Sequence, residues 1–182
     1  QTLAHELGHA YHGWVMRDLG VFERKLPMGL AETASTLSEQ LVESAALDRA
    51  EGQEWLRLLD ERLERAVTFM VNIPARFRLE RRMHAERRKG TLDEEKLTRM
   101  TEEIFEDAYG DGVESVDPTF WASKLHYYIT RLPFYNFPYT FGYLFSRAVY
   151  RRAKEAGAGY ADVVDDLLRD TRSEERRVGK EC

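Results

Sequence analysis

Two histidines and a glutamate near the start of the sequence have the spacing of a catalytic metal site. His5 and His9 are four positions apart, so an α-helix would place both imidazoles on one face, where they could bind one zinc ion. Glu6 lies between them and could reach a water molecule in an open coordination position. Zinc polarises a carbonyl group in such sites, and the glutamate takes a proton from the water. The spacing therefore predicts the chemistry of a metallopeptidase.

A third ligand is expected on a second helix. Two histidines leave a zinc site in need of one more protein ligand and an open position for water. Glu32 lies 23 positions after His9, which is enough for the first helix to end, turn and return antiparallel. Glu32, Ser35 and Glu39 share one face of this second helix. We expect Glu32 to bind the metal and Glu39 to accept a hydrogen bond from a ligand histidine.

A further histidine, His12, lies on the edge of the same helical face as His5 and His9. The predicted zinc ion already has its ligands, so we do not expect His12 to bind it. We expect His12 either to support the ligands from outside the coordination sphere or to pack in the core. An alternative for the whole motif is a helix that exposes two solvated histidines.

Three blocks of sequence occur in a characteristic order. They are HELGHAYH at residues 5–12, LAETAST at residues 30–36, and a late block with WASKLHYY at residues 121–128 and PFYNFPYTFGYLFS at residues 133–146. Together they resemble the oligoendopeptidase F branch of the thimet-oligopeptidase-like zinc peptidases, over residues 1 to about 170. The resemblance implies hydrolysis of peptide bonds in short peptides by a mostly helical protein with a deep channel. It also implies that His5, His9 and Glu32 bind zinc and that Glu6 is the general base.

The late block contains candidate donors to an oxyanion. The resemblance implies a histidine and a Tyr-rich, Gly-containing segment in this part of the catalytic domain, and both a phenol O–H and a neutral imidazole can donate to a tetrahedral intermediate. Tyr143 follows Gly142 and best matches the thimet branch, whereas His126 lies further upstream than that pattern. The alternative is that these aromatic residues pack in the core. The candidates are His126, Tyr135, Tyr139 and Tyr143.

The two ends of the sequence differ from those of a complete protein. The chain begins at Gln1, only four positions before the first candidate ligand. Residues 172–182, RSEERRVGKEC, resemble a translated sequencing adapter. We therefore interpret residues 1–171 as a C-terminal fragment of a metallopeptidase catalytic domain and residues 172–182 as a tail that is not native.

Charge and cysteine content restrict the partners and the location. The tail contains four basic and three acidic residues, so the preceding residues carry a net charge of −6, against −5 for the whole chain. This negative charge argues against a nucleic-acid partner. Cys182 is the one cysteine and lies in the tail, so we expect no disulfide and a reducing, cytoplasmic location. The most apolar run, residues 132–145, is too short to span a membrane. Oligopeptides are the expected partners.

Apolar periodicity predicts an all-α fold, the C-terminal part of a helical zincin-type catalytic domain. We find neither the alternating pattern of strands nor the glycines of a Rossmann or P-loop motif. We expect Pro74 to kink or break the longest helix and Asp117 to cap the helix that carries His126. The expected helices cover residues 2–19, 30–49, 53–89, 92–109, a segment ending near 130, 141–156 and 161–170.

The sequence favours a zinc endopeptidase that acts on oligopeptides, with two alternatives. A zinc aminopeptidase also combines His-Glu-x-x-His with a distant glutamate. It needs, in addition, an acidic motif that binds the substrate's N-terminus, and the LAETAS and PYTFGY blocks favour the endopeptidase. The other alternative is an inert helical module without activity of its own.

Overall fold

The computed structural model describes residues 2–27, 29–131 and 133–171. Every regular element among these residues is helical and none is a strand, which confirms the predicted all-α fold. The tail expected at residues 172–182 lies outside the described residues. In the part of the chain that the structure describes, no helix has the length and apolar character needed to cross a membrane.

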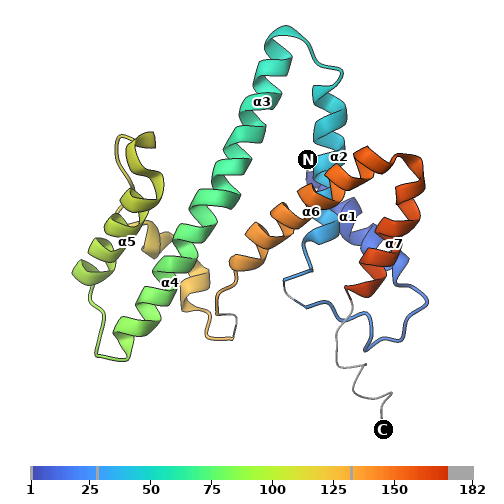
Figure 1. Cartoon of the computed structure of the whole chain (residues 1–182). Helices are drawn as coiled ribbons and strands as arrows, with labels where there is room; N and C mark the ends of the chain where they lie inside the picture. Colours follow the sequence, from blue (N-terminus) through green and yellow to red (C-terminus); the bar gives the residue numbers. More distant parts are fainter. Residues whose placement is uncertain (1, 28, 132, 172–182) are drawn as a thin grey trace. The chain divides into compact units, whose positions relative to one another are not determined.

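Two connections between consecutive α-helices are long, at residues 16–32 and 110–136, and the others are short (Figure 1). The α-helices are α1 (Thr2–Val15), α2 (Thr33–Leu47), α3 (Gly52–Val67), α4 (Ile73–Arg87), α5 (Glu94–Tyr109), α6 (Phe137–Ala156) and α7 (Ala161–Asp170). A π-helical segment (Thr68–Asn72) and 3-10 turns (Gly110–Gly112, Phe120–Ser123, Leu125–Tyr128 and Ala158–Tyr160) lie between them. Contacts divide the chain into two units. The first combines Gln1–Arg62 with Phe141–Cys182, and the second is Leu63–Thr140.

In the first unit, α1 and α2 pack closely and antiparallel. His5 contacts Glu39, whereas Gly8 lies against Ser35. Residue numbers therefore increase along α1 in the direction in which they decrease along α2. A Cβ atom at Gly8 would lie 2.5 Å from the Ala34 carbonyl oxygen and 2.5 Å from the Ser35 Cα. The glycine is therefore what allows the two backbones to approach. α7 packs on the same helix pair through a small apolar cluster made of Val15, Ala34 and Leu168.

The second unit has a conventional apolar core between α4 and α5. Leu79 is fully buried, and the aromatic side chains of Phe120 and Trp121 pack on the rim of the core. The Asp93 side chain accepts a hydrogen bond from the Lys96 N–H at 2.9 Å and caps the start of α5. The buried members of the core are Ala75, Leu79, Met83, Leu97, Met100, Ile104 and Phe105.

The first two helices are shorter than expected. α1 ends at Val15 rather than near residue 19, because Arg17 and Leu19 donate to carbonyls three positions earlier and the chain tightens into turns. α2 begins at Thr33, so Glu32 lies immediately before the helix instead of inside its first turn. The Glu32 carbonyl still accepts a hydrogen bond from the Thr36 N–H at 3.1 Å, as the carbonyl of an N-cap residue does.

The sequence predicts that Pro74 kinks or breaks the longest helix. The structure instead has a π-helical segment directly before the turn that contains Pro74. α3 is followed directly by the π-helical segment, and Pro74 occupies the first turn of α4, where a missing N–H costs least. The Ile73 N–H donates to the Thr68 carbonyl five positions earlier. The wider π-helical turn thus accommodates the proline.

The helix expected around His126 is not formed. Asp117 accepts hydrogen bonds from the Thr119 N–H at 2.9 Å and hydroxyl at 2.7 Å, as an N-cap residue does, but two short 3-10 turns follow. Trp121 and Tyr127 pack from these turns against the core of the second unit. The helix expected at residues 141–156 begins earlier, at Phe137, so α6 contains Tyr139 as well as Gly142 and Tyr143.

Candidate metal centre

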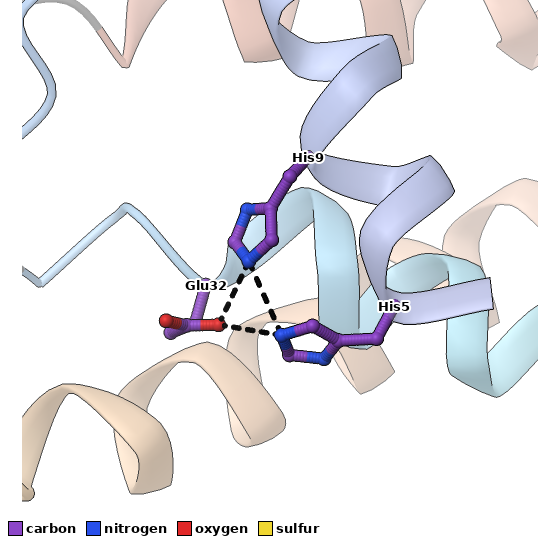
Figure 2. A group of neighbouring side chains, drawn as sticks. All are labelled: His5, His9 and Glu32. Carbon is purple, nitrogen blue, oxygen red and sulfur yellow. Dashed lines mark hydrogen bonds and ion pairs between the residues drawn. The ribbon is translucent and has the colours of Figure 1, made fainter. Parts of the chain in front are cut away.

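The structure brings three potential metal ligands together in the first unit (Figure 2). The Nε2 atoms of His5 and His9 are 3.2 Å apart, and Glu32 Oε2 lies 3.4 Å from the first and 3.5 Å from the second. One donor atom from each residue lies within 4.8 Å of the others. α1 supplies both imidazoles from successive turns, and the residue before α2 supplies the carboxylate.

The donor atoms suit a zinc ion in both type and spacing. Zinc binds imidazole nitrogen and carboxylate oxygen at about 2.0–2.2 Å, and two corners of a tetrahedron with such bonds lie about 3.3–3.5 Å apart. The three separations of 3.2, 3.4 and 3.5 Å match this value. Three protein ligands leave a fourth position for water or substrate, as in catalytic zinc sites. The side chains of His5, His9 and Glu32 are 26%, 36% and 18% exposed, so the fourth position is accessible from solvent.

The other ring nitrogen of His5 contacts a carboxylate. His5 Nδ1 lies 2.5 Å from Glu39 Oε1, across the interface between α1 and α2. In the tautomer that carries its proton on Nδ1, His5 would donate to this carboxylate and would leave the Nε2 lone pair free for a metal ion. This contact is the one expected of Glu39, between a carboxylate on α2 and a candidate ligand histidine on α1.

Glu32 is held by three neighbours. The Ser35 hydroxyl donates to Glu32 Oε2 at 2.9 Å, and the Thr36 hydroxyl lies 2.6 Å from the Glu32 carbonyl and 3.2 Å from that of Gly142. A Cβ atom at Gly142 would lie 3.2 Å from Glu32 Cβ, so α6 approaches the glutamate closely at this glycine. The sequence pattern did not identify Gly8 or Gly142 as packing positions. Their positions beside candidate site residues in the sequence could have identified them, since small residues permit close approach of helices.

Glu6 and His12 lie on α1 in different surroundings. Glu6 is exposed between the two histidines in sequence, where a base that exchanges protons with water can act. His12 is only 1% exposed, and its Nε2 lies 2.8 Å from the Thr171 hydroxyl and 3.1 Å from the Leu168 carbonyl. Burial lowers the pKa of His12, which favours the neutral ring. These hydrogen bonds connect α1 to the end of α7.

Of the four candidate oxyanion donors, only Tyr143 lies in the unit that contains the three candidate metal ligands. Tyr143 is 7% exposed on α6 and follows Gly142, the residue that contacts Glu32. The Arg147 guanidinium lies 4.6 Å from the centre of the Tyr143 ring. This stacking fixes the ring from the side of the next helical turn.

The other three candidates, His126, Tyr135 and Tyr139, belong to the second unit. His126 Nε2 is buried without a hydrogen-bond partner among the described residues. Burial, assisted by the charges of Arg76 and Lys124, lowers the pKa of His126. The Tyr139 hydroxyl donates to the Tyr135 hydroxyl at 3.2 Å. The second unit thus contains an imidazole with an unpaired nitrogen and a pair of hydrogen-bonded phenols.

The segment before α6 has a constrained backbone. Phe134 adopts a positive φ of 59°, which side chains other than glycine rarely adopt. Its N–H donates to Glu80 Oε1 at 2.6 Å, and Glu80 is only 4% exposed. A buried carboxylate on α4 therefore holds the turn from which Tyr135 projects.

Comparison with known proteins identifies one family. The sequence profile described as Peptidase family M3 matches residues 1–174, which include both histidines, the glutamates and the Tyr-rich segment. No curated protein and no solved structure matches the chain significantly.

Proposed function

Because the chain belongs to peptidase family M3, a family of zinc metalloendopeptidases, we propose that it hydrolyses internal peptide bonds of oligopeptides at the site formed by His5, His9 and Glu32. The observation that supports this most directly is the spacing of the three donor atoms, 3.2, 3.4 and 3.5 Å, on residues that the family profile covers. We further propose that the activity belongs to the oligoendopeptidase F branch, on the residue blocks that resemble it.

The protein residues take distinct parts in the proposed reaction. A bound zinc ion supplies Lewis-acid chemistry and lowers the pKa of water. Glu6 takes a proton from the attacking water and gives it to the nitrogen of the leaving amine. Glu39 keeps His5 in the tautomer and orientation that ligation needs. Tyr143 donates its phenol proton in a hydrogen bond to the developing oxyanion, and His126, Tyr135 and Tyr139 are the other candidates for this role.

Cleavage of a blocked peptide tests the proposal and separates its alternatives. The full chain, loaded with zinc, is incubated with an internally quenched peptide whose N-terminus is acetylated, and the products are identified by mass spectrometry. We expect internal cleavage that a chelator abolishes and added zinc restores. An aminopeptidase would leave the blocked peptide intact and release single residues from a free one. An inert module would bind zinc without cleaving either peptide.

The Glu6→Gln variant tests the general base. Glutamine keeps the shape but cannot accept a proton, so we expect kcat to fall by about 100-fold or more while zinc stays bound. Glu95→Gln on α5 is a matched control, because Glu95 is an exposed glutamate that pairs with Arg99 on the same helix. Activity of Glu6→Gln above about one hundredth of wild type would contradict the assigned role.

A further inference from the structure

We propose that Ser35 is a positioning residue that determines which oxygen of Glu32 faces the metal. The Ser35 hydroxyl donates at 2.9 Å to Glu32 Oε2. This same oxygen is the one that lies 3.4 and 3.5 Å from the ligand nitrogens of His5 and His9. The inference rests on the proposed zinc site and adds a residue to it that neither the motif nor the family match assigns.

Glu32 needs such a partner because of its place in the chain. It lies immediately before α2, with φ −93° and ψ 4°, and its side chain makes no capping hydrogen bond to the helix. Its backbone is fixed by the hydrogen bond from the Thr36 hydroxyl and by the close contact of Gly142. The side-chain torsions are not fixed by either contact. A glutamate with free torsions loses rotamer entropy when it binds a metal, and a preformed hydrogen bond reduces that loss.

The surroundings of Ser35 make it a rigid support. Ser35 is fully buried at 0% exposure, and its Cα lies against Gly8, between the two histidines on α1. Its hydroxyl also lies 3.1 Å from the Glu32 carbonyl, so the carbonyl and Oε2 of the same residue share its one proton, with Oε2 the nearer acceptor at 2.9 Å. The interface that brings the histidines to α2 therefore also holds the serine in place.

Ser35 is to Glu32 what Glu39 is to His5. In each case a residue of α2 hydrogen-bonds a ligand side chain: Glu39 at the ring nitrogen remote from the metal position, and Ser35 at the ligand oxygen itself. A hydrogen bond to a ligand oxygen also withdraws electron density from it, which weakens ligation. We expect orientation to prevail, because the hydroxyl is neutral and the glutamate keeps its full charge.

Zinc affinity measured on the full chain tests the proposal without any need for activity. Competition with a chromophoric chelator gives the dissociation constant of wild type, Ser35→Ala and Ser38→Ala. Loss of a partner that orients a ligand weakens metal binding by about 10–100-fold, and this is the expectation for Ser35→Ala. Ser38 is a matched control, since it lies one turn further along α2 and lines a separate apolar cavity. We expect its variant to bind zinc within about twofold of wild type.

A double-mutant cycle separates positioning from a general loss of structure. If Ser35 acts through the carboxylate, its replacement by alanine should have little effect on zinc affinity in a Glu32→Ala background, where the oxygen that it bonds is absent. An equal loss in both backgrounds would overturn the proposal. The visible spectrum of bound Co²⁺ is a second readout, because the number and geometry of the ligand atoms determine its bands. Ser35→Ala should change this spectrum, and Ser38→Ala should not.

The outcomes distinguish this inference from the proposed function. Wild type that fails to bind one zinc ion, or that binds it equally well after His5→Ala, contradicts the proposed metal site itself. Wild type that binds zinc through His5 while Ser35→Ala binds it equally tightly contradicts only the positioning role. The melting temperature of the zinc-free Ser35→Ala variant should match wild type, since alanine fits the space and favours the helix.

Discussion

Among the described residues, both units bury apolar side chains, but the first unit buries many more polar ones than the second. In the first unit, the interior around α2 is polar: Thr33, Ser35, Thr36, Gln40, Glu43 and Ser44 are all buried. In the second unit, the interior between α4 and α5 is an apolar cluster centred on Leu79. The apolar residues of the first unit contribute a much smaller cluster, with Val15, Ala34 and Leu168 buried in it.

This difference indicates that apolar burial mainly stabilises the fold, whereas buried polar groups position side chains. Burial of apolar side chains stabilises a fold without fixing any polar atom in a particular direction. Hydrogen bonds among buried polar groups are directional, so they can hold a carboxylate or an imidazole at one orientation. The proposed metal ligands lie in the unit that buries more polar side chains, where Glu39, Ser35 and Thr36 contact them.

The largest expected effect concerns catalysis at Tyr143. Replacement of Tyr143 by phenylalanine should lower kcat by about 100–1,000-fold, as expected for loss of an oxyanion donor, with little change in KM. Steady-state kinetics on a fluorogenic peptide measures both constants. Tyr150→Phe is the matched control on α6, because the Tyr150 hydroxyl bonds to Ser44 at 2.5 Å rather than to substrate. An unchanged kcat for Tyr143→Phe would transfer the role to His126, Tyr135 or Tyr139.

Next in size is an effect on stability in the second unit. Leu79→Ala removes a fully buried side chain and should lower the free energy of unfolding by about 2–5 kcal/mol. Zinc affinity, measured where the variant remains folded, should not change. Urea denaturation and chelator competition check the two parts, with the 73% exposed Leu3 changed to alanine as control. A parallel loss of zinc affinity would show that the two interiors do not have separate tasks.

A smaller effect is expected at the contact between α1 and α2. Gly8→Ala places a Cβ atom 2.5 Å from backbone atoms of Ala34 and Ser35, and such overpacking costs about 1–3 kcal/mol. The shift should also move the histidines relative to Glu32 and weaken zinc binding. Gly13→Ala on the same helix meets nothing within 4 Å and should stabilise the protein by up to about 1 kcal/mol. Equal stabilities for the two variants would contradict the close helix contact.

The smallest effect is the dependence of stability on pH. Burial lowers the pKa of His12 in the first unit and of His126 in the second, whereas both return to about 6.5 in the unfolded chain. Below about pH 6.5 the unfolded state therefore binds more protons, so these two residues make the zinc-free protein less stable as the pH falls. His12→Gln and His126→Gln should each flatten the dependence of the unfolding free energy on pH between 8 and 5. A steeper dependence in either variant would contradict the lowered pKa.

The sequence by itself determined the all-helical fold and the family. Helical periodicity and the order of the three blocks can both be recognised in the sequence without any information on packing. It also suggested His5, His9 and Glu32, since a helix fixes the relation of residues four apart and one further ligand was chemically necessary. The helix boundaries at Val15 and Thr33 were less accessible, because tight turns and capping depend on small differences in local hydrogen bonding.

Only the tertiary structure decided how the ligands are held. The close contacts of Gly8 with α2 and of Gly142 with Glu32 join separate elements, and no spacing within one helix reveals which of their faces meet. The 3-10 turns around His126 likewise follow from the packing of Trp121 and Tyr127 against the core of the second unit, which overrides the Asp117 capping signal. Local patterns specify elements and ligand types, whereas contacts between elements fix the orientation of each ligand side chain.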